Sequence, residues 1–401
     1  MSGRAVDLPP VAKISPFYDP RVRGFVYQGL LVLALGILIY GAASNAIANM
    51  QARNIPTNFD FWNKTSGFDI NFTLIPYSAQ STFGDAFWVG LLNTLLVAAI
   101  GVFFATILGF IVGVARLSPN WIVARMATIY VESLRNVPLL LQLLFWYNAI
   151  LKPLPGVRDS IVIPGLSGKP FAFLNNRGLV LPQPVFGAEF DLVLAAFGLA
   201  CLLAAGFWFY ARKIQRETGR RLPSGWAGLA LVIGLPAIAY FAAGSPLTLD
   251  YPVLRGFNFS GGARVLPELV ALLLGLILYT ATFIAEIVRA GIQSVARGQS
   301  EAALALGLSG GQVLRLVVIP QAMRVITPPL TNQFLNLTKN STLAVFIGYP
   351  DLVQVFAGSV LNITGAAVQI IAVTMAVYLV ISLLTSLAMS FYMRLTATVE
   401  R

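Results

Sequence analysis

Histidine is absent from this sequence of 401 residues, and cysteine occurs once, as Cys201 inside an apolar run. Serine hydrolases usually rely on a histidine base, and zinc centres are built mainly from histidine and cysteine. A disulfide within the chain would need a second cysteine. The sequence therefore excludes histidine-dependent catalysis, a His/Cys metal centre and an intrachain disulfide. We expect Cys201 to be a small buried apolar residue.

Charge is scarce as well. Only 11% of the residues are charged and 57% are hydrophobic, whereas soluble domains carry about 25% charged residues. Mean hydropathy is +0.77. This composition is typical of a chain with several membrane spans, so we expect a lipid bilayer as its surroundings. The net charge of +11 does not indicate nucleic acid, because the cytoplasmic loops of membrane proteins accumulate lysine and arginine.

The phosphate-binding loop of P-loop ATPases is also missing. No G-x-x-x-x-G-K-[ST] pattern occurs, and the one Gly-Lys step, Gly168-Lys169, is followed by Pro170 and lacks the earlier glycine. In P-loop proteins the backbone of that loop holds the phosphates of the nucleotide. We therefore expect no cofactor in this chain and no ATP site of its own.

Long apolar runs fill most of the sequence. A span needs about 20 mostly apolar residues. Eight segments qualify: 24–43, 87–114, 127–150, 190–210, 226–244, 267–290, 323–347 and 366–391. The first follows Arg21 and Arg23, but its apolar stretch is longer than a signal-peptide core, which favours a retained anchor. The fold class predicted is all-α, a polytopic membrane protein with about eight transmembrane helices.

Lysine and arginine are distributed unevenly between the two sides of the predicted membrane. With the N-terminus placed inside, 18 of the 27 fall on the inner side, including those of the basic loop 211–225. This bias predicts that both termini are cytoplasmic. Segments 44–86, 151–189 and 245–266 then lie outside, and their proline, glycine and asparagine content favours irregular loops.

The inner segment 299–322 contains GLSGG at residues 307–311, which fits the G-x-S-x-G pattern of a hydrolase nucleophile elbow. Such an elbow follows a strand, and its serine needs a base. No strand-rich region precedes Ser309, and Lys339, the nearest lysine downstream, is predicted to lie a membrane's depth away. A helix, a glycine-rich turn and a second helix with a boundary at Pro320 fit the residues better. Ser309 is therefore interpreted as a turn residue.

Ionisable side chains inside a bilayer are costly unless they are paired or functional. Glu132–Arg135 and Glu286–Arg289 both have the i,i+3 spacing that places two side chains on one helix face. Both pairs lie near the predicted inner ends of their spans. Each is either a local ion pair at a helix end or a contribution to an inner gate or to coupling.

A polar stripe runs along the seventh predicted span, where helical spacing brings together Asn332, Asn336, Lys339 and Asn340. At about 1.5 Å per residue, Lys339 lies roughly 24 Å along a helix that starts near residue 323. The stripe either forms hydrogen bonds between helices or lines a translocation path, where Lys339 would counter a substrate carboxylate. Weaker candidates for the same lining are Asn93, Gln142 and Thr280.

The inner segment resembles a known family. Its residues match the loop E-A-A-x₃-G-x₉-I-x-L-P of permease subunits of bacterial ABC importers, through Glu301, Ala302, Ala303, Gly307, Val317, Ile319 and Pro320. Val317 and Ile319 depart from the pattern but remain branched and apolar. Residues 90–118, 130–147, 279–303 and 336–353 look like parts of the polar-amino-acid permease group. The resemblance covers 85–150 and 265–395, and the length is similar to that of the longer permeases of general L-amino-acid importers.

The resemblance implies a five-helix type I importer core in two parts, residues 85–150 and 265–395. Around it lie a cytoplasmic segment at 1–23, an extra span with an outer loop at 24–84, and an insertion with two further spans at 151–264. The loop that carries the motif occupies 291–322. The insertion contains no motif that indicates its role.

The resemblance also implies partners. The loop would dock on an ATPase dimer that binds ATP, through Glu301, Ala302, Ala303, Gly307 and Pro320. A second homologous permease and a periplasmic amino-acid-binding protein would complete an importer of polar L-amino acids in the bacterial inner membrane. The alternative is an ion- or proton-coupled secondary transporter of small polar solutes. Such proteins use ionisable residues near the midplane and often inverted repeats, and neither is evident here.

Overall fold

The structure is a computed structural model that describes residues 20–52, 56, 58–165, 170–220, 222–256 and 258–396. The predicted N-terminal segment 1–23 lies outside these residues except for its last four. Within the described part, seven helical stretches are long and apolar enough to cross a membrane. They centre on α1 (Pro20–Ala52), α2 (Phe83–Ala115), α5 (Phe190–Thr218), α6 (Ser224–Ala242), α7 (Pro267–Gln293), α10 (Ile319–Asn340) and α12 (Ala367–Thr396). With shorter apolar helices between them, they confirm the mainly helical membrane fold.

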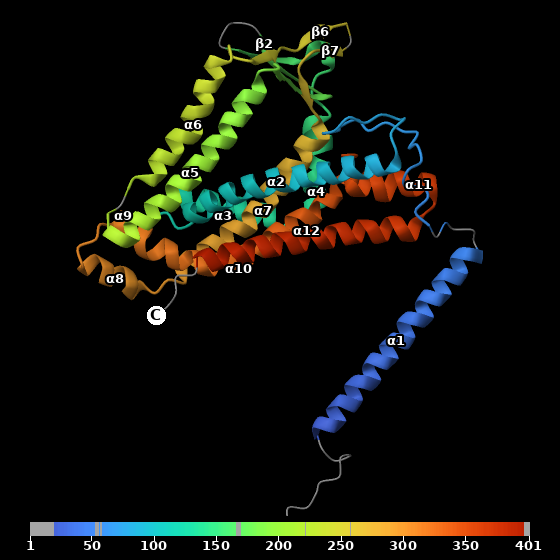
Figure 1. Ribbon diagram of the computed structural model, residues 1–401, viewed down its shortest axis with the longest axis horizontal. Coiled ribbons are helices and arrows are strands. Elements are labelled where there is room, and N and C mark those ends of the chain that lie inside the picture. Colours follow the sequence, from blue (N-terminus) through green and yellow to red (C-terminus); the bar gives the residue numbers. More distant parts are fainter. Residues whose placement is uncertain are drawn as a thin grey trace, which may run out of the picture.

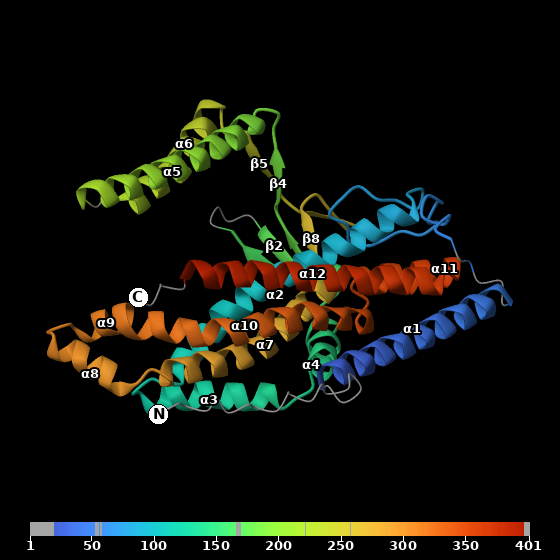
Figure 2. The ribbon, with the colours of Figure 1, turned by 60° about the horizontal axis from the view of Figure 1, so that its bottom comes forward.

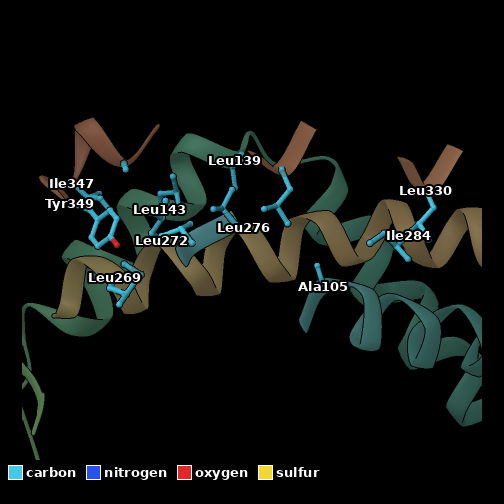
Figure 3. Close-up of a cluster of buried hydrophobic side chains, with 14 of the residues drawn as sticks. Ala105, Leu139, Leu143, Leu269, Leu272, Leu276, Ile284, Leu330, Ile347 and Tyr349 are labelled. Carbon is cyan, nitrogen blue, oxygen red and sulfur yellow. The ribbon is translucent and has the colours of Figure 1, made fainter. Parts of the chain in front are cut away.

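Helices α2, α7, α10 and α12 form a central bundle (Figure 1). Helix α7 lies at its middle and packs against α2, α10 and the short helix α4 (Leu139–Leu144). Figure 3 shows Leu272 and Leu276 of α7 facing Leu139 and Leu143 of α4, with Leu330 of α10 above Ile284. Because α7 is enclosed on several sides, it connects the two predicted parts of the core.

Small residues recur at every fourth position of α2, namely Gly101, Ala105, Gly109 and Gly113. This spacing puts them on one face of the helix. A Cβ added to Gly109 would lie 2.5 Å from Cβ of Ile284, and one added to Gly113 would lie 2.8 Å from Cβ of Val288. Close backbone approach of this kind is what holds apolar helices together in a bilayer, where van der Waals packing replaces the hydrophobic effect. Gly109 and Gly113 therefore set the spacing between α2 and α7, whereas Gly101 makes room for Leu337 of α10.

The predicted span 127–150 is wrong as a single helix. The chain forms α3 (Trp121–Arg135), leaves the helical path at 136–138, and continues as α4 and the π-helical segment η2 (Phe145–Leu151). Pro138 explains the break, because proline has no N–H to donate and disfavours the α conformation of Val137 before it. The apolar content of this stretch did not reveal the break, and only its second part, Leu139–Leu151, is a continuous apolar helix.

The outer segments of the insertion fold into eight short strands rather than the irregular loops predicted for 151–189 and 245–266. The strands are β1 (Ile161–Pro164), β2 (Pro170–Asn175), β3 (Gly178–Leu181), β4 (Gln183–Phe186), β5 (Leu247–Asp250), β6 (Val253–Arg255), β7 (Asn258–Ser260) and β8 (Ala263–Val265). A sheet of order β1-β2-β3-β8 stands beside the ribbons β4-β5 and β6-β7, all antiparallel. We call this group of strands the platform. Each strand is too short for its alternation to be distinguished from turn residues in the sequence.

Helices α5 and α6 form a hairpin that extends from the platform and lies apart from the central bundle (Figure 2). They pack mainly against each other. Cys201 on α5 is consequently exposed, which contradicts the expectation that it is buried. A membrane helix that packs against only one other helix is exposed over most of its circumference, and Cys201 lies on the exposed part.

The long helices, together with α3, alternate in direction along the chain (Figures 1 and 2). Helices α1, α3, α6 and α10 run away from the end of the molecule that carries α8 (Arg297–Ala305), whereas α2, α5, α7 and α12 run towards it. This alternation agrees with an even number of passes. It also places the loop that contains α8 at one end of the bundle and the platform towards the other.

Candidate functional site: a glycine-capped loop and a polar stripe

The loop between α7 and α10 begins with α8 and ends that helix at Gly307. Gly307 has φ +81°, the left-handed conformation that glycine adopts without steric cost. The N–H of Leu308 donates to the carbonyl of Ala303 at 3.3 Å, and the N–H of Gly307 donates to that of Leu304 at 2.9 Å. These two bonds are the Schellman arrangement of a helix C-terminus. The glycine of the loop motif is therefore required by the backbone turn.

Helix α8 presents a mixed surface outwards. Glu301 and Ala302 are exposed, and the apolar Leu304 and Leu306 are exposed beside them, Leu306 to 83%. Ala303 is only 5% exposed, so it packs against its own chain and cannot offer the open face predicted for it. An acidic side chain among exposed leucines, with small residues around it, is a surface suited to a protein partner. The sequence motif did not predict the two leucines, because they stand at its x positions, where it specifies no residue type.

Ser309 caps the next helical turn, α9 (Gly310–Val313). Its N–H donates to Oε1 of Gln312 at 2.8 Å, and its hydroxyl donates to the same oxygen at 3.0 Å. The hydroxyl is thus engaged with an amide oxygen and not with a base. This geometry agrees with a turn residue and gives no support to a nucleophile.

Pro320 does not end the helix, contrary to the predicted boundary. The chain is helical from Gly310 into α10, through a π-helical turn, η4 (Leu314–Val318), immediately before Pro320. Proline removes one hydrogen bond of the helix and clashes with the carbonyl four residues earlier. A π turn widens the helix at that point, so the chain passes Pro320 without stopping. Pro320 itself is exposed.

Glu286 is held by two arginines at the α8 end of the bundle. Its carboxylate forms ion pairs with Arg289 on its own helix and with Arg116 at the C-terminus of α2. The first pair confirms the predicted i,i+3 contact, whereas Arg116 was missed because it is 170 residues away in the chain. This cluster joins α2 to α7 about two turns before α7 ends and the loop that contains α8 begins.

The other predicted ion pair does not form. Glu132 and Arg135, both in the described part of α3, make no salt bridge. The guanidinium of Arg135 instead lies 5.0 Å from the ring centre of Phe283 on α7, within cation–π range. Arg135 thereby fastens α3 to α7, and Glu132 is left exposed.

The polar stripe of α10 faces away from the core of its own chain. Asn332, Asn336 and Lys339 are exposed and Asn340 is partly so, while Leu337 and Thr338 on the opposite face are buried. Within the described residues no acidic side chain pairs with Lys339. A stripe of three amides and an ammonium on a membrane helix needs a protein or water surface against it. The stripe is therefore placed for a second subunit or an aqueous path.

The weaker candidates do not join this stripe. Asn93 is fully buried, and its amide donates to the carbonyls of Phe72 and Pro350 at 3.0 and 2.8 Å. Gln142, 5% exposed, donates to the carbonyls of Leu134 and Val137 across the break between α3 and α4. Thr280 is 3% exposed. The two amides hold turns in place because buried backbone carbonyls need donors.

A buried carboxyl also escaped the sequence reasoning. Asp351 lies in the turn between η5 (Ser341–Phe346) and η6 (Val353–Val360), and it is 1% exposed. Burial raises the pKa of its carboxyl to about 7, although backbone N–H bonds act in the opposite direction. One of these bonds comes from Gln354 at 2.8 Å. The available signal was an acid in a long apolar stretch with no base nearby.

Alternating apolar passes, a capped loop exposed at one end and an outward polar stripe together define a membrane permease. A family described as "Binding-protein-dependent transport system inner membrane component" matches residues 262–399. Over 385 residues the chain is 48% identical to the putative amino-acid ABC transporter permease protein YhdX of Escherichia coli, covering 96% of this chain and 97% of that protein. It is 45% identical over 407 residues to the general L-amino acid transport system permease protein AapQ of Rhizobium johnstonii, which it matches over the full length of both. A third relative, BztB of Rhodobacter capsulatus, is 40% identical with 96% of both chains covered.

The chain belongs to the family of ABC transporter permease proteins of the inner membrane. This is a family of transport subunits and not of enzymes. Membership also decides between the two transport mechanisms considered from the sequence, since the relatives are ABC permeases and not ion-coupled secondary transporters.

Proposed function

We propose that this permease subunit moves L-amino acids, chiefly polar ones, into the cytoplasm, and that a separate ATPase drives it through α8. The observation that carries the proposal is the exposed surface of Glu301, Ala302 and Leu306 on a helix ended by Gly307. Three relatives that match nearly the whole chain are named as amino-acid permeases, one of them for glutamate, glutamine, aspartate and asparagine. These names support the substrate class.

The proposed orientation places α8 and both termini in the cytoplasm and the platform in the periplasm. The excess of lysine and arginine on the α8 side supports it. The proposed partners are an ATPase dimer on α8, a second homologous permease against the polar stripe of α10, and a periplasmic amino-acid-binding protein at the outer face. Relatives named GltJ and GltK from glutamate/aspartate import support a pair of permeases. ATP would be bound by the ATPase alone, since this chain has no phosphate-binding loop.

Coupling would run from α8 to the bundle through short, rigid connections. Closure of the ATPase dimer would displace α8. This helix is joined to α7 by a three-residue turn, and the turn at Gly307 joins it to the continuous helix formed by α9, η4 and α10. The Glu286 cluster then holds α2 to α7, so these helices move together. Such movement would alternate access to the α10 stripe between the two sides, because ATP binding favours one of two states.

Lys339 is the residue proposed to counter the substrate carboxylate. Its ammonium is exposed and unpaired within the described chain, and three amides flank it on the same stripe. A positive charge with hydrogen-bonding neighbours suits an amino acid that crosses a low-dielectric region.

Uptake by proteoliposomes that contain the assembled importer tests the proposal. Radiolabelled L-glutamate or L-glutamine should enter only when ATP and the ATPase subunit are present. Replacing Lys339→Gln should raise the KM for transport about tenfold, the value of one charge-assisted contact, while Lys64→Gln on the outer loop should leave it unchanged. Uptake driven by a cation gradient without the ATPase would contradict the proposal.

A further inference from the structure

The platform contains a pocket of about 310 Å³ between its four-stranded sheet and the β6-β7 ribbon. The pocket belongs to the insertion, for which the sequence indicated no role. Its lining consists of two arginines, two asparagines, two glycines and three apolar residues: Arg177, Arg264, Asn175, Asn258, Gly261, Gly262, Val157, Val180 and Phe259. No acidic side chain is among them.

The floor of the pocket is apolar. Val180 on β3 is 4% exposed, and it pairs with Phe173 on β2 and with Arg264 on β8. Directly paired residues of antiparallel strands share a face, so Arg264 rises from the same surface as these apolar side chains. Phe259 covers this face from the ribbon, with its ring centre 4.7 Å from that of Phe173.

Arg177 is held by neutral partners. Its Nη1 donates to Oδ1 of Asn258 at 2.7 Å, and its backbone N–H donates to Oδ1 of Asn175 at 2.9 Å. Asn175 is 1% exposed and donates in turn to Ser160 at 3.1 Å. These contacts orient the guanidinium but leave its charge uncompensated, because each acceptor is an amide or hydroxyl oxygen.

Arg264 lacks a compensating charge too. Among the described residues neither it nor Arg177 forms an ion pair. The carboxylate of Asp250 accepts the N–H of Gly262 at 3.3 Å and lies against Gly261, yet Asp250 does not line the pocket. Both arginines are exposed to solvent, so an anion that enters the pocket would meet two guanidinium groups beside one apolar floor, neither of them already paired with a carboxylate of the described residues.

We propose that this pocket binds a carboxylate with a short aliphatic stem. Guanidinium groups present parallel N–H donors that match the two oxygens of a carboxylate, and the floor of Val180 and Phe259 receives the stem. Two sources carry this chemistry, a free acidic amino acid and an Asp or Glu side chain of the periplasmic binding protein. The second source rests on the proposed function, whereas the first does not.

Titration of the purified full chain in nanodiscs tests the free ligand. Glutarate and L-glutamate should bind in a saturable, salt-sensitive manner, and the neutral diamide of glutarate should not. Arg177→Gln and Arg264→Gln should each weaken binding about tenfold. Lys152→Gln, an exposed cation at the end of η2 that is not in the pocket, should bind as the wild type does.

Titration of the assembled importer with its binding protein tests the other source. Arg177→Glu and Arg264→Glu should raise the concentration that half-stimulates ATP hydrolysis about tenfold without lowering the maximal rate, since rim charges act mainly on encounter. A positive result in either arm supports the pocket and identifies the source. If the arginine variants behave as the wild type in both titrations, the proposal is overturned. If the wild-type assembly hydrolyses no ATP at all, the proposed function fails, and the nanodisc titration still decides the pocket.

Discussion

Gly307 shows at the scale of one residue how the loop motif works. Gly298 and Gly307 both lie on the surface of the loop with no atom within 4 Å of an added Cβ, but only Gly307 has a positive φ. Lack of room for a side chain therefore does not explain the glycine of the motif, whereas the left-handed turn that ends α8 does. Glu301 makes no hydrogen bond or ion pair within the described chain, so no contact inside the chain accounts for an acidic residue at this position.

Replacing Gly307→Ala is expected to weaken association with the ATPase. The left-handed conformation costs a non-glycine residue about 1–2 kcal/mol, so α8 would fray or turn differently. Gly307→Asn should restore part of the association, since asparagine tolerates this conformation. Pull-down of the ATPase by the detergent-solubilised complex measures the effect. The matched control is Gly298→Ala inside α8, and equal loss in the two alanine variants would contradict the explanation.

Asp351 leads to a pH dependence of stability. Its folded pKa of about 7 lies above the value of about 3.9 for an unfolded aspartate, so folding favours the neutral form. The stability that this group contributes is complete below about pH 4 and is lost as the pH rises through about 7. Thermal unfolding in detergent should show a falling midpoint across this window and a plateau above it. Asp351→Asn should flatten that part of the curve, and an unchanged slope would contradict the assignment.

At the scale of elements, the small-residue face of α2 sets how closely α7 approaches. The contact depends on glycines whose missing Cβ atoms leave room for Ile284 and Val288. The ion pair of Arg116 with Glu286 then fixes the two helices at the α8 end. Close packing along the helices and one ion pair at their end thus both hold α2 against α7.

Gly109→Ala is expected to destabilise the protein, because the new Cβ would lie 2.5 Å from Ile284. Overpacking of this kind typically costs about 1–3 kcal/mol. The midpoint of thermal unfolding in detergent should fall accordingly. Gly206→Ala on α5, where an added Cβ meets nothing within 4 Å, is the control and should leave the midpoint unchanged or raise it slightly. The α2–α7 contact would be ruled out as the cause if both variants unfolded alike.

Sequence reasoning succeeded for elements and residues whose signal is local. The long apolar runs and the turn at Gly307 follow from residues within one or two helical turns. Helical spacing also placed Asn332 and Lys339 on one side of α10, but the part that this stripe plays in transport stays a prediction. It failed where the determinant is distant or subtle. Arg116 meets Glu286 only after folding, and Pro138 broke a run that hydropathy alone reads as continuous. The platform was missed because strands of three to six residues leave no clear periodicity.

At the scale of the whole molecule, three regions have different dependence on partners. The central bundle buries its own core around α7. Helices α5 and α6 pack mainly against each other and little against the bundle, as expected for helices that face lipid. The loop with α8 and the stripe of α10 are polar or mixed surfaces left open at the places where an ATPase and a second permease are proposed to bind.

The central claim is that α8 transmits the action of the ATPase, and reversing the charge of Glu301 tests it most directly. The measurement is ATP-driven amino-acid uptake by proteoliposomes, together with the amount of ATPase that co-purifies with the permease. Coupling through α8 predicts that Glu301→Lys lowers both at least about tenfold, since a charged residue central to an interface is worth about 2 kcal/mol or more. The control is Glu217→Lys at the end of α5, an exposed glutamate that pairs with Lys213, and it should behave as the wild type. Uptake and association that survive Glu301→Lys would contradict the claim.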